Sequence, residues 1–176
     1  MTLSPRLRRL VLTAHVVSSV GWLGAVATTL ALGVVGLTSQ DPQTVRGAYI
    51  ALEPTGWLVL VPLSLASLLT GFIQSLGTKW GLFRHYWVLF KLLINVVASI
   101  ILVMYMQTLG FFADSAAQAT SPGAGLAVLR SPSVVLHAGG ALVLLLLATV
   151  LSVYKPRGMT RRGWRRQQEE RAVLVP

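Results

Sequence analysis

The stretch LLINVVASIILVMYMQTLGFFA, residues 92–113, contains no Asp, Glu, Lys or Arg. A helix rises about 1.5 Å per residue, so a stretch of this length spans the roughly 30 Å hydrocarbon core of a bilayer. Because lipid offers no hydrogen-bond partners, an isolated apolar segment must satisfy its own backbone groups, and the α-helix does so. The stretch therefore predicts a membrane-spanning helix.

Three further stretches lack the same four residue types: 10–40, 54–78 and 131–154. The composition agrees, because 54% of the residues are hydrophobic and only 11% are charged, which is too little charge for the surface of a soluble domain of this size. We predict helices at about 10–37, 48–76, 86–112 and 131–154, followed by a basic cytoplasmic tail, 155–176. Short connections between sequential helices favour an all-α, antiparallel four-helix bundle in the membrane.

The first apolar stretch has some features of a secretion signal. Arg6, Arg8 and Arg9 precede it, and Ala25-Val26-Ala27 resembles a cleavage site. Apolar sequence continues to Leu37, however, which is longer than the apolar core of a signal. We expect an uncleaved helix.

The charges alternate along the predicted path. Basic residues precede the first helix, follow the second (Lys79, Arg84, Lys91) and follow the fourth (Lys155, Arg157, Arg161, Arg162, Arg165, Arg166, Arg171). The other two connections balance Arg46 against Asp41 and Glu53, and Arg130 against Asp114. The positive-inside rule therefore predicts a multi-pass protein of a bacterial plasma membrane with both termini in the cytoplasm.

The basic tail has two interpretations. Arg161, Arg162, Arg165 and Arg166, with Trp164 among them, are typical of a topology determinant and an anchor to anionic lipid head groups. Arginine clusters also neutralise nucleic-acid phosphates or bind partner proteins, but only the charge supports that alternative.

Polar residues at membrane depth usually face a bundle interior or a cavity. In the second helix they follow one stripe, which we expect to face the other helices: Glu53, Trp57, Ser64, Ser67, Gly71 and Gln74. Pro62 predicts a kink near mid-membrane. Such a kinked polar helix is one hypothesis for a transport pathway, which four helices would form only as an oligomer. Ordinary packing of small residues between helices is the competing explanation.

An inner group of candidate residues lies in the cytoplasmic leaflet: His15, Arg84, His85, Lys91 and Asn95. Cationic groups at this depth suit a ligand, an anionic lipid head group or a partner. His15 and His85 are also candidates for the two axial ligands of haem b, which needs no cysteine. A histidine that only bonds a neighbouring helix, and a lysine that extends to the interface, are the alternatives.

An outer group consists of His137, Glu53, Met104 and Met106. Imidazole and thioether ligands suit copper, especially Cu(I). Met104 and Met106 lie about 200° apart around a helix, so at most one of them points into the bundle with His137. A hydrogen bond between Glu53 and His137 is the simpler interpretation.

The chain lacks the usual marks of an enzyme. It contains no cysteine, which excludes disulfides, thiolate metal sites and cysteine nucleophiles. No Ser/His/Asp set, phosphate-binding glycine loop or HExxH pattern is present.

Two segments carry a resemblance to known families. The run GTKWGLFRHYWVLFK, residues 77–91, together with HVVSSVGWLG, residues 15–24, resembles a family of small bacterial integral membrane proteins of unknown function. The resemblance covers most of the four-helix region and implies a role for Arg84, His85 and Lys91 at the inner face. His15 followed by Trp22-Leu23-Gly24 is more distantly similar to the copper-resistance D family, whose members have more helices.

Our leading hypothesis is a non-enzymatic membrane component with a ligand, lipid or partner site at its inner face. A haem b or copper protein is the second hypothesis, and a small transporter or channel subunit is the third. Homo-oligomers and membrane-complex partners are compatible with each of them.

Overall fold

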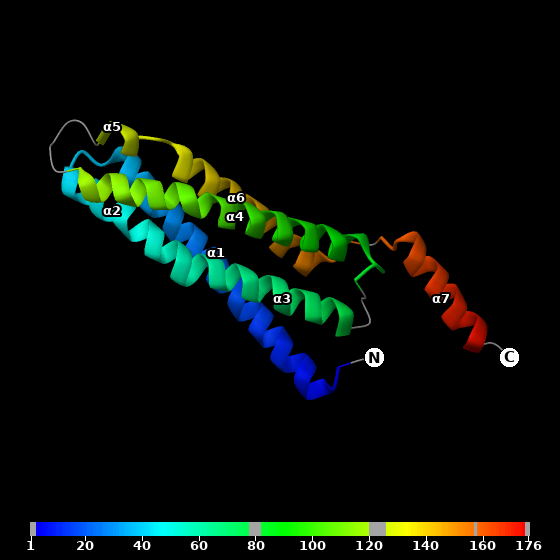
Figure 1. Ribbon diagram of the computed structural model, residues 1–176. Helices are drawn as coiled ribbons and strands as arrows, with labels where there is room; N and C mark the ends of the chain where they lie inside the picture. The colour runs from blue at the N-terminus through cyan, green and yellow to red at the C-terminus, as the bar shows by residue number, and fades with distance from the viewer. Residues whose placement is uncertain (1–2, 78–81, 120–125, 157, 175–176) are drawn as a thin grey trace.

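The computed structural model describes residues 3–77, 82–119, 126–156 and 158–174, apart from the side chain of Leu126 and several side chains of the last helix. Its helices are α1 (Pro5–Thr38), α2 (Pro42–Thr55), the π-helical segment η1 (Gly56–Leu60), α3 (Val61–Gly77), α4 (Tyr86–Gln118), α5 (Leu126–Leu129), α6 (Ser133–Tyr154) and α7 (Arg161–Leu174). The predicted all-α membrane bundle is confirmed, since four long apolar segments pack side by side (Figure 1).

The four long segments are α1, the continuous α2–η1–α3, α4 and α6. The α1 helix packs against the second segment and α6, while α4 packs against the other side of the same two partners. Both termini lie at the same end of the bundle, and α7 extends beyond that end (Figure 1).

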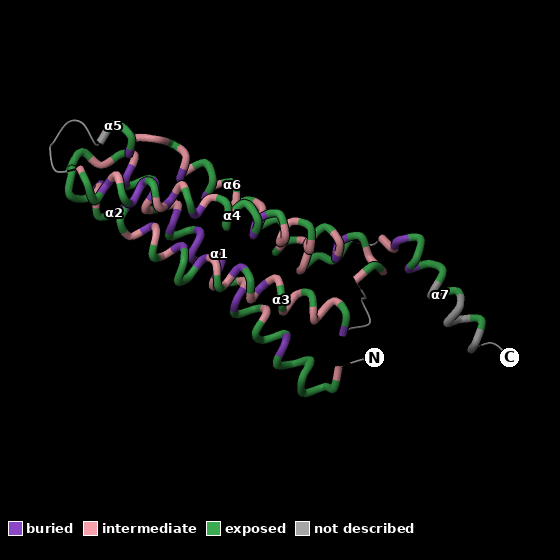
Figure 2. The backbone as a smooth tube through the Cα atoms, in the orientation of Figure 1, coloured by how far each residue is buried: buried purple, intermediate pink, exposed green. Residues whose placement is uncertain are grey.

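The exposed surface of the bundle is apolar. Large hydrophobic side chains on all four segments are exposed, among them Leu58, Met104, Leu136 and Val153. Buried residues follow the inner sides of the helices, and exposed residues alternate with them along the tube (Figure 2). A chain with four apolar helices of this length and an apolar outer surface is a multi-pass membrane protein.

The second long segment is interrupted by a π-helical turn. Val61 N–H donates to the carbonyl of Gly56, five residues earlier, instead of four. Pro62, which follows directly, has no N–H to donate to Leu58, so the regular ladder is already broken there. The irregularity expected near Pro62 therefore takes the form of a π turn that ends just before it.

The π turn decides which side chains enter the core. Gly56 and Leu60 are buried, whereas Trp57 is exposed. The expectation that Trp57 shares a buried stripe with Ser64 and Ser67 is wrong, because Gly56 and Leu60, and not Trp57, take the buried positions of this turn. A Cβ on Gly56 would overlap Met106, so the absence of a side chain lets α4 approach closely.

Two arginine side chains connect helices at the end of the bundle opposite the termini. Arg130 donates to the carbonyls of Leu37 and Ser39 at 2.7 and 2.6 Å. Arg46 donates to the carbonyls of Ala116 and Ala117 at the end of α4. Each guanidinium therefore satisfies carbonyl groups that the helix itself leaves unpaired.

Candidate functional site

A polar junction joins three helices in the half of the bundle nearer the termini. Ser67 on α3 lies at its centre, 1% exposed. Its hydroxyl oxygen lies 2.8 Å from the Ser19 hydroxyl on α1 and accepts from the Asn95 amide on α4 at 3.2 Å. Of the stripe predicted for the second helix, Ser67 is the member that bonds to both α1 and α4.

His15 packs against α3 beside this junction. Its Nδ1 lies 3.1 Å from both the Ser67 carbonyl and the Thr70 hydroxyl. The Thr70 hydroxyl already donates to the Ala66 carbonyl, so both neighbours act as acceptors and Nδ1 carries the proton. Gly71 leaves room for the ring, because a Cβ there would lie 3.0 Å from Cε1 of His15.

Lys91 and Asn95 extend the junction along α4. The Nζ of Lys91 is 5.8 Å from the centre of the Trp87 ring. Asn95 Oδ1 and the Ser99 hydroxyl are buried and have no hydrogen-bond partner among the described residues. Buried polar atoms of this kind require a water molecule or another polar group. His15 and Asn95 therefore meet at Ser67, more than two helical turns of α3 and α4 away from the termini-facing connection, while Lys91 lies about one turn before Asn95 on α4.

Arg84 and His85 belong to a different set of contacts. The Arg84 carbonyl accepts from Thr160 N–H at 3.1 Å, and His85 pairs with Met159 in an isolated β-bridge. The Thr160 hydroxyl donates to the Phe83 carbonyl and also accepts from Gly163 N–H at 3.1 Å. These contacts dock the start of α7 onto the connection between α3 and α4.

Gly163 makes this docking close. A Cβ on Gly163 would overlap the carbonyl of Arg84. The Arg162 guanidinium lies 5.8 Å from the centre of the Phe83 ring, in the geometry of a cation–π contact. This docking was not predicted from the sequence, although a threonine directly before a helical run is a recognised N-cap signal.

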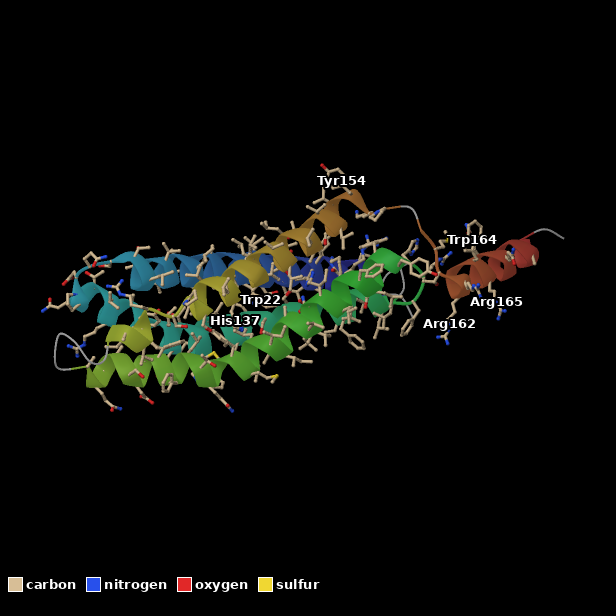
Figure 3. The ribbon with its side chains drawn as sticks, turned by 90° about the horizontal axis from the view of Figure 1, so that it is seen from above. Trp22, His137, Tyr154, Arg162, Trp164 and Arg165 are labelled. Atoms are coloured by element: carbon tan, nitrogen blue, oxygen red, sulfur yellow. The ribbon has the colours of Figure 1, made fainter. Side chains whose placement is uncertain are left out.

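Basic side chains gather at the end of the bundle that carries the termini. Arg6, Arg8 and Arg9 are exposed on the first turns of α1, and Arg161, Arg162 and Arg165 are exposed on α7. The latter helix, with Trp164, projects past the bundle (Figure 3). The side chain of Arg166 and the whole of Lys79 lie outside the described residues. We use the name basic end for Arg84 together with the six exposed arginines, which are Arg6, Arg8, Arg9, Arg161, Arg162 and Arg165.

The two histidines proposed as haem ligands, His15 and His85, have different neighbours. His15 contacts Ser67 and Thr70 inside the bundle, whereas His85 pairs with Met159 and its ring lies 6.4 Å from that of Trp87. Within the described ranges, no group of three or more His, Asp or Glu side chains could hold a metal ion.

The outer group is not brought together as one site. Met104 is 69% exposed on the apolar surface, and Met106 is buried against Gly56. Glu53 lies beside Gly110, where a Cβ would be 3.4 Å from its Oε1. His137 instead stacks on Tyr105, with ring centroids 4.0 Å apart.

His137 is held by its own helix. Its Nδ1 donates to the Ser133 carbonyl at 2.9 Å. Among the described residues it forms no hydrogen bond to Glu53, so the bond considered from sequence is absent. His137 and Trp22 both line an apolar cavity near the middle of the bundle (Figure 3).

Comparison with known proteins adds no relative to these observations. No protein-family model, no curated protein and no solved structure matches the chain. The residues themselves therefore carry the assignment, which at this level is a multi-pass helical membrane protein.

Proposed function

We propose that this protein is a non-catalytic component of a bacterial plasma membrane that binds anionic phospholipid head groups at its basic end. Both termini lie in the cytoplasm under this proposal. The resemblance of residues 77–91 to small bacterial membrane proteins is part of the proposal and points to the same end of the molecule.

One observation carries the proposal: three separate parts of the chain bring cationic side chains to one end. They are the first turns of α1, the connection before α4, and α7, which is docked through Thr160 and Gly163. A chain that needed its arginines only during insertion would not need to fix α7 in place. Each basic residue near an anionic surface contributes about 1 kcal/mol to the attraction.

Lys91 adds a cation inside the first turns of the membrane segment. It lies over Trp87, a residue type that prefers the interface between lipid and water. A head-group phosphate could reach Lys91 from the basic end, which suits a lipid better than a soluble anion. The buried Asn95 Oδ1 beyond it offers an acceptor for water or for a head-group hydroxyl.

The test is a lipid-dependent shift in thermal unfolding. Protein in neutral detergent is titrated with phosphatidylglycerol or phosphatidylcholine, because a ligand that binds only the folded state raises the unfolding temperature. We expect a rise with phosphatidylglycerol alone, and a smaller rise in the double variant Arg162→Gln/Arg165→Gln. High salt should reduce the effect, because exposed charges are screened.

The matched control is Arg46→Gln/Arg130→Gln, which removes the same charge from the opposite end. This control should keep the full phosphatidylglycerol shift, whatever its own unfolding temperature. Equal shifts with the two lipids, or equal losses in the two double variants, would contradict the proposal.

Haem b is a second candidate because of the geometry of His15. Its Nδ1 proton is fixed on two acceptors, and Nε2 has no hydrogen-bond partner among the described residues. Histidines that ligate metals commonly donate their other ring N–H to a backbone carbonyl in this way. A Soret band in protein purified from its native membrane, lost in His15→Ala and His85→Ala, would support this candidate; a spectrum without any such band would remove it.

A further inference from the structure

An apolar cavity of about 530 Å³ lies between α1, η1, α4 and α6. Its lining includes Trp22, Leu60, Ala98 and Ala141. Small-molecule sites in proteins commonly have volumes of about 300–1,000 Å³ and mostly apolar walls with a few polar groups. The cavity therefore has the size and character of a ligand site, and it is separate from the basic end.

The cavity is reached from the bilayer. Three of its lining residues, Ile101, Leu136 and Val143, are also large exposed side chains on the apolar outer surface of α4 and α6. A ligand that enters between these two helices must therefore already be dissolved in the membrane.

The main polar feature of the cavity is the stacked pair of His137 and Tyr105, in which one imidazole nitrogen is a hydrogen-bond acceptor without a donor in the described part of the chain. The Ser133 carbonyl can only accept, so Nδ1 of His137 carries the proton in the neutral imidazole, and Nε2 is an acceptor. His137 is an exposed residue that lines the cavity, and among the described residues its Nε2 has no hydrogen-bond partner. The stacked Tyr105 ring holds the imidazole, and the Tyr105 hydroxyl lies 2.8 Å from the Ser133 hydroxyl. The Thr29 hydroxyl, which also lines the cavity, already donates to the Ala25 carbonyl.

We propose that this cavity binds a lipid-soluble phenol, the chemical class to which reduced isoprenoid quinones belong. The phenol hydroxyl donates a hydrogen bond to Nε2 of His137. An unprotonated imidazole nitrogen can only accept, so its partner must be a donor. Its flat ring packs beside the Trp22 indole, since aromatic rings gain from stacked or edge-to-face contact. Its apolar tail leaves between α4 and α6 into the bilayer. An acyl chain would fill the same space but would leave Nε2 without a donor.

Gly140 provides a way to close the cavity without disturbing the fold. It lines the cavity, and a Cβ built on it meets no heavy atom within 4 Å. Gly140→Leu should therefore fill the space with its own side chain. Gly24 on α1 has the same open surroundings and does not line the cavity, so Gly24→Leu is the matched control.

The experiment compares two probes of nearly equal shape. 4-Nonylphenol can donate a hydrogen bond, and its methyl ether, 4-nonylanisole, cannot. Binding to the full chain in detergent is followed by tryptophan fluorescence. We expect the phenol to bind about tenfold more tightly than the ether, which corresponds to about 1.4 kcal/mol. His137→Phe, which retains a stacking ring, should remove this difference, and Gly140→Leu should abolish the binding of both probes.

Two results would overturn the proposal. Equal affinities of the phenol and the ether for the unaltered protein would mean that the cavity accepts any apolar chain. Unchanged binding in Gly140→Leu would place the probe elsewhere. Normal binding in Gly24→Leu is required for the loss in Gly140→Leu to count in favour of the cavity.

Discussion

Individual glycines determine how closely the helices of this protein approach one another. Gly36 on α1 faces the Tyr49 ring, and a Cβ there would lie 2.5 Å from Cε2 of the tyrosine. Tyr49 is fully buried, and its hydroxyl donates to the Leu129 carbonyl at 2.5 Å. The contact between α1 and α2 and the position of α5 thus both depend on a residue without a side chain.

Gly36→Val should therefore lower the thermal unfolding temperature in detergent. Overpacking of this kind costs about 1–3 kcal/mol, because the Tyr49 ring must move and its hydroxyl loses the carbonyl. Gly24→Val adds the same side chain to the same helix in open space and should change the temperature little. Similar losses in both variants would mean that helix propensity, not the Tyr49 contact, is responsible.

Asp41 makes the stability of the folded protein depend on pH. It caps α2, and the hydroxyl of Thr44, with the N–H groups of Thr44 and Gln43, donates to its carboxylate and holds its pKa below the ordinary value. A carboxylate with a lowered pKa stabilises the folded state above its unfolded pKa of about 3.9. That stabilisation is lost as the pH falls through the lower folded value.

Asp41→Asn should be less stable than the unaltered protein at pH 7, and the difference should shrink below about pH 4. The measurement is the unfolding temperature of both proteins between pH 7 and pH 3. A difference that stays constant down to pH 3 would show that the charge of Asp41 contributes nothing to the cap.

At the scale of single elements, the charge-free stretches predicted the fold class but not the details that position the site. The helices continue past the apolar stretches, since α2 begins at Pro42 and includes Arg46, whose charge is satisfied by carbonyls of α4. Pro62 indicates that the helix is irregular near this point, but not that the irregularity is a π turn between Gly56 and Leu60. The cavity beside His137 arises from the packing of four segments and has no signal in any one of them.

The inner site divides in the same way. His15 and Asn95 both contact Ser67 because helical spacing placed each of them on an inward face, which a sequence reveals. Arg84 and His85 look like members of the same group in sequence. Their backbone instead pairs with residues 159 and 160, more than seventy positions later, and only the folded chain reveals that contact.

The docking of α7 depends strongly on one side chain, that of Thr160. Thr160→Val keeps the shape of the side chain but removes both hydrogen bonds of its hydroxyl, to Phe83 and from Gly163. Loss of an N-cap costs about 1 kcal/mol. We expect faster backbone hydrogen exchange across Arg161–Leu174, measured by mass spectrometry, with little change in the four long segments.

Thr149→Val is the control for this change. It is the same substitution near the end of α6, where the threonine hydroxyl bonds only its own helix, at the Leu145 carbonyl. Exchange in α7 should then remain as in the unaltered protein. Unchanged exchange of α7 in Thr160→Val would show that the helix is held by its lipid contacts or by Arg162 over Phe83 instead.

At the scale of the whole molecule, the two ends of the bundle use arginine differently. At the end with α5, Arg46 and Arg130 are partly buried and donate to helix carbonyls. At the end with the termini, the arginines of α1 are exposed, and so are Arg161, Arg162 and Arg165 of α7. Only the second arrangement leaves cationic charge available to a membrane surface, which is the physical basis for our proposal that this end faces the cytoplasm.

The absence of cysteine makes this orientation directly measurable, because any introduced thiol is unique. Each of four variants carries a single thiol. Ser4→Cys and Gln168→Cys place it at the end with the termini, and Gln43→Cys and Gln118→Cys place it at the opposite end. Intact cells are treated with a membrane-impermeant maleimide. We predict labelling of Gln43→Cys and Gln118→Cys, and labelling of Ser4→Cys and Gln168→Cys only after lysis. Labelling of either terminal variant in intact cells would contradict the four-span arrangement with both ends inside, and with it the assignment of the basic end to the inner leaflet.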